Sequence, residues 1–128
     1  MGVQYLSDEY MAAGNVALEE SAEVAAAVDG LTLAMAFEVS DGPDGDFEHY
    51  ISVKDGKVEI GRGHLPDADA TIRNSYKTSA KLSQGTLSNQ MGFMTGKIKI
   101  SGSMGVLMKH SRALDVIQET LSGLDIDY

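Results

Sequence analysis

Leu31-Thr-Leu-Ala-Met-Ala-Phe-Glu-Val39 is the stretch that decides the fold, because its large apolar residues recur at every second position. Successive side chains of a β-strand point to opposite faces of the sheet, so this alternation predicts a strand with one strongly apolar face. The apolar positions are Leu31, Leu33, Met35, Phe37 and Val39. Such a face has to be covered, and the helix-forming segment that precedes it can supply the cover.

Four further strands are expected downstream. After a turn-rich loop at residues 41–46, apolar and polar residues alternate again from Phe47 to Val53. Asp55-Gly56 is typical of a two-residue hairpin, so residues 57–61 should return antiparallel. The last two expected strands are residues 70–73 and residues 97–100, the latter with isoleucines inward and lysines outward.

Helix signals complete the pattern. Helices are expected over residues 7–27, 75–84, 88–94 and 103–122. Ser7 can cap the first of these, and Gly14-Asn15 could divide it in two. The last is expected to be continuous, with an apolar stripe wider than contact with one sheet requires.

Composition predicts one cytoplasmic domain over residues 1–128. Hydrophobic residues make up 43% of the chain and charged residues 23%, as in an ordinary globular domain. No apolar run approaches the roughly 20 residues needed to cross a bilayer, and residues 1–9 lack the basic head and apolar stretch of a signal peptide. Zero cysteines remove disulfides and thiol chemistry, which fits a reducing compartment.

Charge is distributed unevenly along the chain. The net charge is −9, and residues 1–70 carry 15 acidic and 3 basic side chains, whereas residues 71–114 carry 7 basic and no acidic ones. The basic stretch has two interpretations. It could form solvated faces that keep the protein soluble, or it could attract an anionic head group or membrane surface.

Several motifs in the second half carry a family resemblance through their order and spacing. They are Asp69-Ala-Thr-Ile-Arg73, Gly85-Thr-Leu-Ser-Asn-Gln90, Phe93-Met-Thr-Gly-Lys-Ile-Lys-Ile-Ser-Gly102, Met104-Gly105 and Met108-Lys109. Upstream, Phe37-Glu-Val-Ser-Asp-Gly-Pro-Asp-Gly45 matches a first strand and a glycine-rich hairpin loop. From about residue 30 to about residue 110 the chain resembles the sterol carrier protein 2 family, and we expect a stand-alone prokaryotic member.

The resemblance implies an α+β fold and a lipid-binding function. It implies a five-stranded mixed, mostly antiparallel β-sheet, covered on one side by about four or five helices, with an apolar tunnel between sheet and helices. The implied function is that of a non-catalytic intracellular carrier without a cofactor. It would hold a fatty acid, fatty acyl-CoA, phospholipid or sterol-like ligand and make transient contact with a membrane or a lipid-metabolising enzyme. The alternative is an accessory or protein-interaction module of lipid or steroid metabolism with a filled or vestigial cavity.

Methionines are the most suggestive candidates for ligand contacts. Met91, Met94, Met104 and Met108 fall within 18 residues of one another. The unbranched, polarizable side chain of methionine can repack around ligands of different shape, although it can equally fill gaps in a solid core. Together with the positions that the resemblance implies, the predicted ligand-binding residues are Met35, Phe37, Leu82, Gln90, Met91, Phe93, Met94, Met104, Leu107 and Met108.

Other chemistries lack the residues they need. The Gly-x-Ser-x-Gly pattern is absent, and His49 lies on the inward register of a strand, where we expect a hydrogen-bonded core or cavity-edge residue. Residues 44–55 imitate part of a calcium loop, but His49 occupies the position that requires glycine. A sequence pI near 4.6 argues against a nucleic-acid partner. We therefore expect neither an enzyme nor a metal protein.

Overall fold

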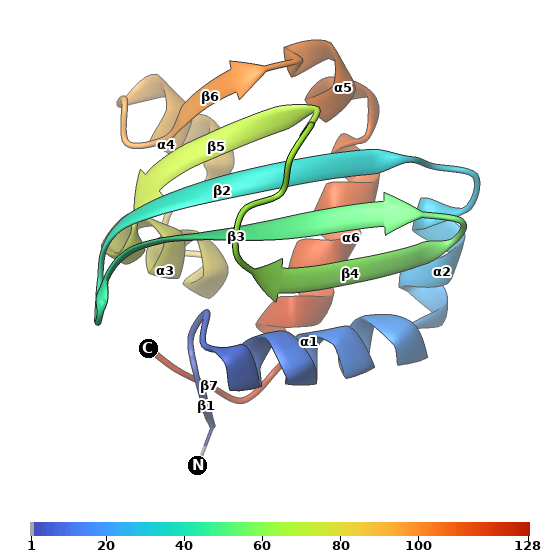
Figure 1. Ribbon diagram of the computed structural model, residues 1–128, viewed down its shortest axis with the longest axis horizontal. Helices are drawn as coiled ribbons and strands as arrows, with labels where there is room; N and C mark the ends of the chain where they lie inside the picture. The colour runs from blue at the N-terminus through green and yellow to red at the C-terminus, as the bar shows by residue number, and fades with distance from the viewer. Residues whose placement is uncertain (1) are drawn as a thin grey trace.

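A five-stranded sheet forms the centre of the molecule (Figure 1). The computed structural model describes residues 2–128. In spatial order the strands are β4 (Lys57–Arg62), β3 (Gly45–Lys54), β2 (Leu33–Gly42), β5 (Ala70–Ser75) and β6 (Lys99–Gly102). All neighbouring pairs are antiparallel except β2 and β5, which are parallel. The predicted α+β class and the mixed, mostly antiparallel sheet are confirmed.

The alternation in β2 fixes which face of the sheet is buried. The register pairs Leu33 with Val53, Met35 with Ile51 and Val39 with Phe47, so apolar side chains of β2 and β3 share one face. Leu33, Met35 and Val39 are almost completely buried. The inner face of β2 is therefore the floor of the core, as its sequence pattern predicts.

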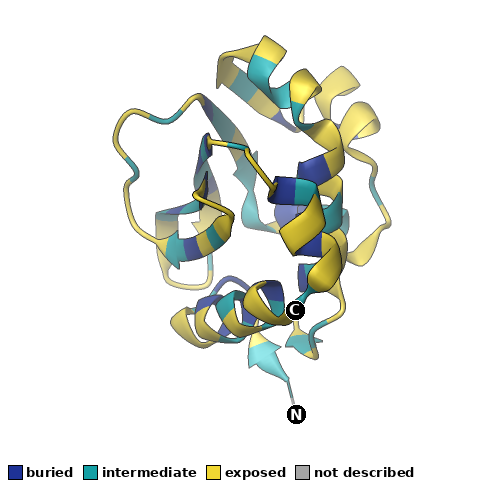
Figure 2. Cartoon of the chain, turned by 90° about the vertical axis from the view of Figure 1, so that its right-hand side faces the viewer, coloured by how far each residue is buried: buried dark blue, intermediate teal, exposed yellow. Residues whose placement is uncertain are grey.

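Helices cover this inner face. Within the described chain they are α1 (Asp8–Glu20), α2 (Ala22–Val28), α3 (Tyr76–Gln84), α4 (Asn89–Met94), α5 (Met104–Lys109) and α6 (Ser111–Ser122). In Figure 1, α3 and α6 lie behind the sheet, and the side view in Figure 2 shows the exposed positions on the outer surfaces of the helices. None of the helices in residues 2–128 is both long enough and apolar enough to cross a bilayer.

The first predicted helix is divided, but at Ser21 and not at Gly14-Asn15. Ser21 has an extended backbone conformation, and its hydroxyl caps α2 by accepting a hydrogen bond from the backbone N–H of Val24. Gly14 and Asn15 remain inside α1 because both serve contacts with neighbouring elements. A Cβ at Gly14 would lie 2.5 Å from the Ile60 side chain, so glycine allows α1 to approach β4 closely.

Two boundaries near the C-terminal half also differ from the prediction. The terminal helix breaks at His110, whose backbone (φ −108°, ψ 19°) leaves the helical region, and α6 then packs against α1 and α2. The last strand begins at Lys99 because the N–H groups of Lys97 and Ile98 both donate to the carbonyl of Gly92 and close a turn after α4. These two breaks and the one at Ser21 reflect hydrogen bonds and packing that a periodic pattern does not contain.

A small parallel pair was not expected from the sequence. Strand β1 (Val3–Gln4) pairs with β7 (Ile126–Asp127), which brings residues from the two ends of the chain side by side below α1 (Figure 1). Two-residue strands are too short for alternation to reveal them.

Asn15 protects the edge of the sheet. Its side-chain N–H donates to the carbonyl of Ile60, and its side-chain oxygen accepts from the N–H of Ile60, both at 2.8 Å. Since β4 is an edge strand, these backbone groups would otherwise have no strand to pair with. One asparagine of α1 thus supplies the pairing that a sixth strand would have made.

We expect Asn15→Ala to lower the free energy of unfolding by about 1–3 kcal/mol, because it leaves two partly buried backbone groups of Ile60 unpaired. Urea denaturation measures this effect as a lower midpoint at unchanged slope. Val16→Ala is the control, since Val16 is the next residue of α1 and is 54% exposed. A midpoint for Asn15→Ala that matches the control would contradict the role given to Asn15.

Candidate ligand-binding pocket

A pocket of about 610 Å³ lies between the inner face of the sheet and the helices, and we call it the inner pocket. Its side chains from the sheet include Met35, Phe37, His49, Ile51, Ile72 and Asn74. Its side chains from the helices include Tyr10, Met11, Leu82, Leu107, Leu114 and Leu121. This volume falls in the usual range of roughly 300–1,000 Å³ for sites that hold small molecules.

The inner pocket is lined mainly by apolar side chains. Among the described residues that line it there is no lysine or arginine, and Asp115 is the one acidic residue. Without a cation in the lining, a buried anionic group of a ligand would have no partner for its charge. The lining therefore suits hydrocarbon better than a charged head group.

The predicted ligand-binding residues divide into two groups. Met35, Phe37, Leu82 and Leu107 line the inner pocket. The other six lie elsewhere on the molecule, and they are Gln90, Met91, Phe93, Met94, Met104 and Met108. Met94 and Met108 are 71% and 73% exposed.

The orientation of α4 explains why its methionines point outward. Gly92 is the buried residue of this short helix, and a Cβ there would lie 2.6 Å from the side chain of Ile98. The helix therefore packs against the chain before β6 through its glycine. Met91, Phe93 and Met94 are consequently left at the surface.

His49 is the most unusual residue of the lining. Its ring stacks on that of Phe37, with centroids 4.5 Å apart and planes within 3° of parallel. The residue is only 8% exposed, and within the described structure its Nε2 atom has no hydrogen-bond partner. The expected inward register and a position at the edge of a cavity are thus observed, whereas Nε2 forms no hydrogen bond with any described residue.

Burial is the larger cause, and the nearby positive charge of Arg62 the smaller one, of a pKa of His49 that is lowered to about 3. The ring is therefore uncharged at neutral pH. A neutral imidazole can donate from one ring nitrogen and accept at the other, so Nε2 can pair with a polar group of either kind.

Asn74 is a second polar residue of the same lining. It lies on β5 in register with Val39 of β2, on the inner face of the sheet, and its buried Oδ1 has no hydrogen-bond partner among the described residues. Buried polar atoms in native proteins usually have partners. His49 and Asn74 therefore both hold a buried polar atom without a partner in residues 2–128, and both line the inner pocket.

Residues near the start of the chain contribute lining that sequence patterns did not indicate. Tyr5, Leu6, Tyr10 and Met11 all line the inner pocket. The Tyr5 hydroxyl lies 2.8 Å from the hydroxyl oxygen of Ser79, and burial raises the pKa of Tyr5 to about 12. These residues precede or begin α1, so no alternation marks them, and only the packing of α1 below the sheet brings them to the pocket (Figure 1).

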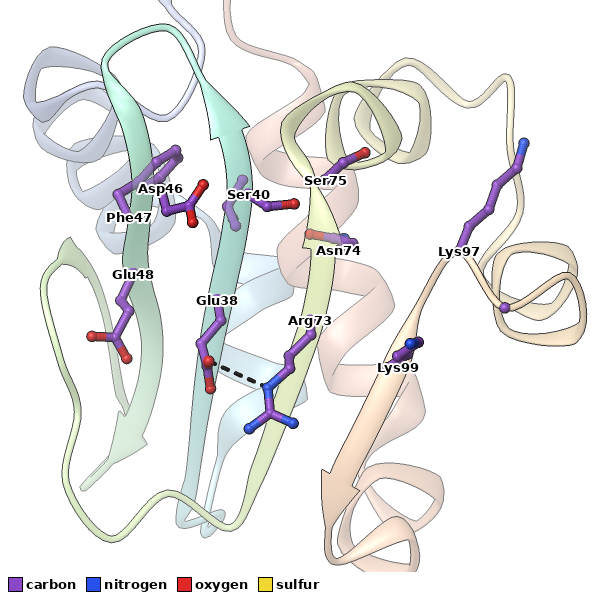
Figure 3. Close-up of a pocket in the computed structure, with 12 residues that line it drawn as sticks. Glu38, Ser40, Asp46, Phe47, Glu48, Arg73, Asn74, Ser75, Lys97 and Lys99 are labelled. Carbon is purple, nitrogen blue, oxygen red and sulfur yellow. Dashed lines mark ion pairs between the residues drawn. The ribbon is translucent and has the colours of Figure 1, made fainter.

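A second hollow, the outer groove, lies on the opposite face of the sheet and is shown in Figure 3. Its charged side chains carry both signs, and Val39, Phe47 and Asn74, which the register places on the inner face, also line it. Arg73 pairs with Glu38 at 3.2 Å, and Glu48 and Lys99 lie on neighbouring strands. This groove is open and charged, and it offers less apolar surface to a hydrocarbon chain than the inner pocket does.

The fold and the inner pocket together define an α+β domain that can enclose a largely apolar small molecule. The model of the SCP-2 sterol transfer family matches residues 15–115 of this sequence. The chain belongs to this family, whose members bind and transfer lipids. The resemblance expected from the motifs is therefore confirmed.

Known relatives agree with this assignment. Sterol carrier protein 2 of Rattus norvegicus is 36% identical over 96 residues, which cover 71% of this chain and 16% of that protein. Sterol carrier protein 2 of Homo sapiens is 37% identical over 75 residues, which cover 58% of this chain and 14% of that protein. The chain thus spans about a sixth of the length of the first of these and about a seventh of the second.

Solved structures show the same fold. A crystal structure of sterol carrier protein 2 has a TM-score of 0.77 at 16% identity and covers 94% of this chain and 99% of its own. The solution structure of the sterol carrier protein domain 2 of Helicoverpa armigera has a TM-score of 0.66 at 28% identity, and the match covers 94% of this chain and 91% of that one.

The pKa of His49 predicts a pH dependence of stability. Unfolded His49 takes up a proton below about pH 6.5, whereas the buried ring does so only near pH 3, so the unfolded state gains stability as the pH falls through this window. Lowering the pH from about 7 to about 5 should therefore reduce the free energy of unfolding by about 2 kcal/mol through this residue.

Urea denaturation of the wild type and of His49→Phe at these two pH values tests this expectation. Phe cannot titrate, so the difference in stability between the two proteins should change by about 2 kcal/mol, with the wild type losing more at the lower pH. Parallel stability curves over this range would show that His49 is not buried in its neutral form.

Proposed function

We propose that this chain is a non-catalytic, intracellular lipid carrier that holds its ligand in the inner pocket. The candidate ligands are a fatty acid, a fatty acyl-CoA, a phospholipid or a sterol-like molecule. The observation that carries the proposal is a pocket of about 610 Å³ that is lined mainly by apolar side chains from both the sheet and the helices. Membership of the SCP-2 sterol transfer family supports it.

Hydrophobic burial would provide adequate affinity for such a ligand. Around 14 methylenes at roughly 0.8 kcal/mol each contribute about 11 kcal/mol. Association and chain ordering cost about 4 kcal/mol or more, which leaves about 5–7 kcal/mol. The corresponding dissociation constants lie between roughly 10 and 200 µM, and a polar contact would make binding tighter.

Filling the pocket should weaken binding of the ligand. We expect Leu107→Trp to weaken binding of a fluorescent fatty acid by about tenfold or more, because the indole occupies space that the hydrocarbon needs. Met108→Trp places the same side chain on the next residue, which is 73% exposed, and should leave the affinity within about twofold. Fluorescence titration measures both variants.

Equal affinities in Leu107→Trp and the wild type would show that the ligand does not occupy the inner pocket. Absence of any binding by the wild type would instead favour the accessory module with a filled or vestigial cavity. Lipids extracted from the purified protein and identified by native mass spectrometry provide a check that is independent of the probe.

The exposed apolar residues of α4 and α5 have a separate place in this proposal. The two helices flank β6, one before it and one after it (Figure 1). Both expose large apolar side chains. We propose that Met91, Phe93, Met94, Met104 and Met108, with the neighbouring Gln90, contact the lipid or a membrane surface while the ligand enters or leaves. Lys97 and Lys109 lie beside these residues in sequence and can interact with phosphate head groups.

The double variant Met94→Ser, Met108→Ser should separate transfer from binding. We expect it to slow transfer of a fluorescent fatty acid to phosphatidylcholine vesicles by about fivefold or more, because apolar contact with the bilayer is lost. Equilibrium affinity should stay within about twofold. Val16→Ser changes an exposed apolar residue of α1, away from α4 and α5, and serves as the control. Unchanged transfer by the double variant would exclude this surface from the transfer step.

A further inference from the structure

We infer that the lipid in the inner pocket carries an uncharged polar group, a hydroxyl in the simplest case, which forms a hydrogen bond with Nε2 of His49. This inference rests on the proposed carrier function and narrows the chemical class of the ligand. It assigns to His49 the role of a specificity-determining residue within a lining that is otherwise mainly apolar.

The geometry of His49 is the first argument. The ring lies on β3, opposite Phe37 of β2, and parallel stacking on that ring fixes its plane. The residue is 8% exposed and lines the inner pocket, yet Nε2 has no hydrogen-bond partner in residues 2–128. A buried polar atom without a partner is destabilising, so a ligand group that pairs with it would gain more than the same group on an apolar wall.

Asn74 provides an independent second observation. Its buried Oδ1 also lacks a partner within the described chain, and it lines the same pocket from β5. Two residues of the lining, on two different strands, therefore each hold a buried polar atom whose hydrogen-bonding capacity is unused. A pocket that held only hydrocarbon would leave both atoms unsatisfied in the bound state as well.

The charges around the pocket favour an uncharged group over a carboxylate. No lysine or arginine belongs to the described lining, and Asp115 would repel an anion. Arg62, the nearest cation to His49, lies over the ring of Phe47 and is exposed at the surface. Burial keeps the His49 ring uncharged, so it cannot act as the missing cation. A hydroxyl can both donate and accept, and it therefore suits a neutral imidazole in either tautomer.

Competition between two lipids of equal chain length tests the inference. Diphenylhexatriene, a fluorescent hydrocarbon without a polar group, reports occupation of the pocket, and 1-dodecanol and laurate compete for it at about pH 7.5. We expect the wild type to bind dodecanol about tenfold more tightly than laurate, because laurate would have to bury an unpaired charge. His49→Phe should weaken dodecanol binding by about fivefold to tenfold and leave diphenylhexatriene binding within about twofold.

His64→Phe is the matched control, because it makes the same chemical change on an exposed residue outside the inner pocket, and it should bind both lipids like the wild type. Equal binding of dodecanol by His49→Phe and the wild type, with diphenylhexatriene bound by both, would overturn the inference while leaving the carrier function intact. Failure of diphenylhexatriene and both lipids to bind the wild type would instead reject the carrier function.

A measurement on the wild type makes the test independent of how His49→Phe folds. In long-range ¹H–¹⁵N spectra of the imidazole rings, dodecanol should shift the Nε2 resonance of His49, and diphenylhexatriene should shift it far less. Equal shifts with both ligands would show that the ring responds to occupation of the pocket and not to a hydrogen bond.

Discussion

The apolar inner face of β2 is the constraint on which the rest of the structure depends. This central strand pairs with β3 on one side and β5 on the other, and Leu33, Met35 and Val39 are almost completely buried beneath the helices. Burial of each such side chain is worth about 1.5–3 kcal/mol, so a shift of one residue, which would turn them to the outer face, is strongly disfavoured. The register of β2 therefore also fixes which residues of β3 and β5 face inward.

The inner pocket follows from how the helices meet this face. Phe37 lies between Met35 and Val39 in the alternating pattern of β2. It lines the pocket together with its register partners His49 of β3 and Ile72 of β5. Leu33 and Val39 of the same face do not belong to the described lining of this pocket, whereas Met35 and Phe37 do. The same register that buries the core thus carries one histidine and one asparagine, Asn74, to the wall of a largely apolar pocket. The stability of the fold and the proposed recognition of a ligand consequently depend on the same alternation of residues.

The two hollows of the molecule show how the sheet separates chemistry by face. On the outer face, Glu38 and Arg73 form an ion pair in an open, charged groove (Figure 3). On the inner face, a pocket of similar size has a mainly apolar lining without a basic residue among those described. Because side chains alternate between the faces, neighbouring residues such as Ile72 and Arg73 line different hollows. The inner pocket is therefore the one that suits a lipid.

The sequence by itself determined the fold class, the five strands of the main sheet, the inward register of β2 and β3 and the family, because alternation and spaced motifs are local properties of the chain. Four of the residues that the sequence predicted to bind a ligand line the inner pocket, and they are Met35, Phe37, Leu82 and Leu107. Only the tertiary structure decided that Met94 and Met108 lie at the surface, that Tyr5 and Tyr10 join the lining, and that Nε2 of His49 is left without a partner. These outcomes depend on how α1, α4 and α5 pack against the sheet, through contacts between residues far apart in sequence that no local pattern contains.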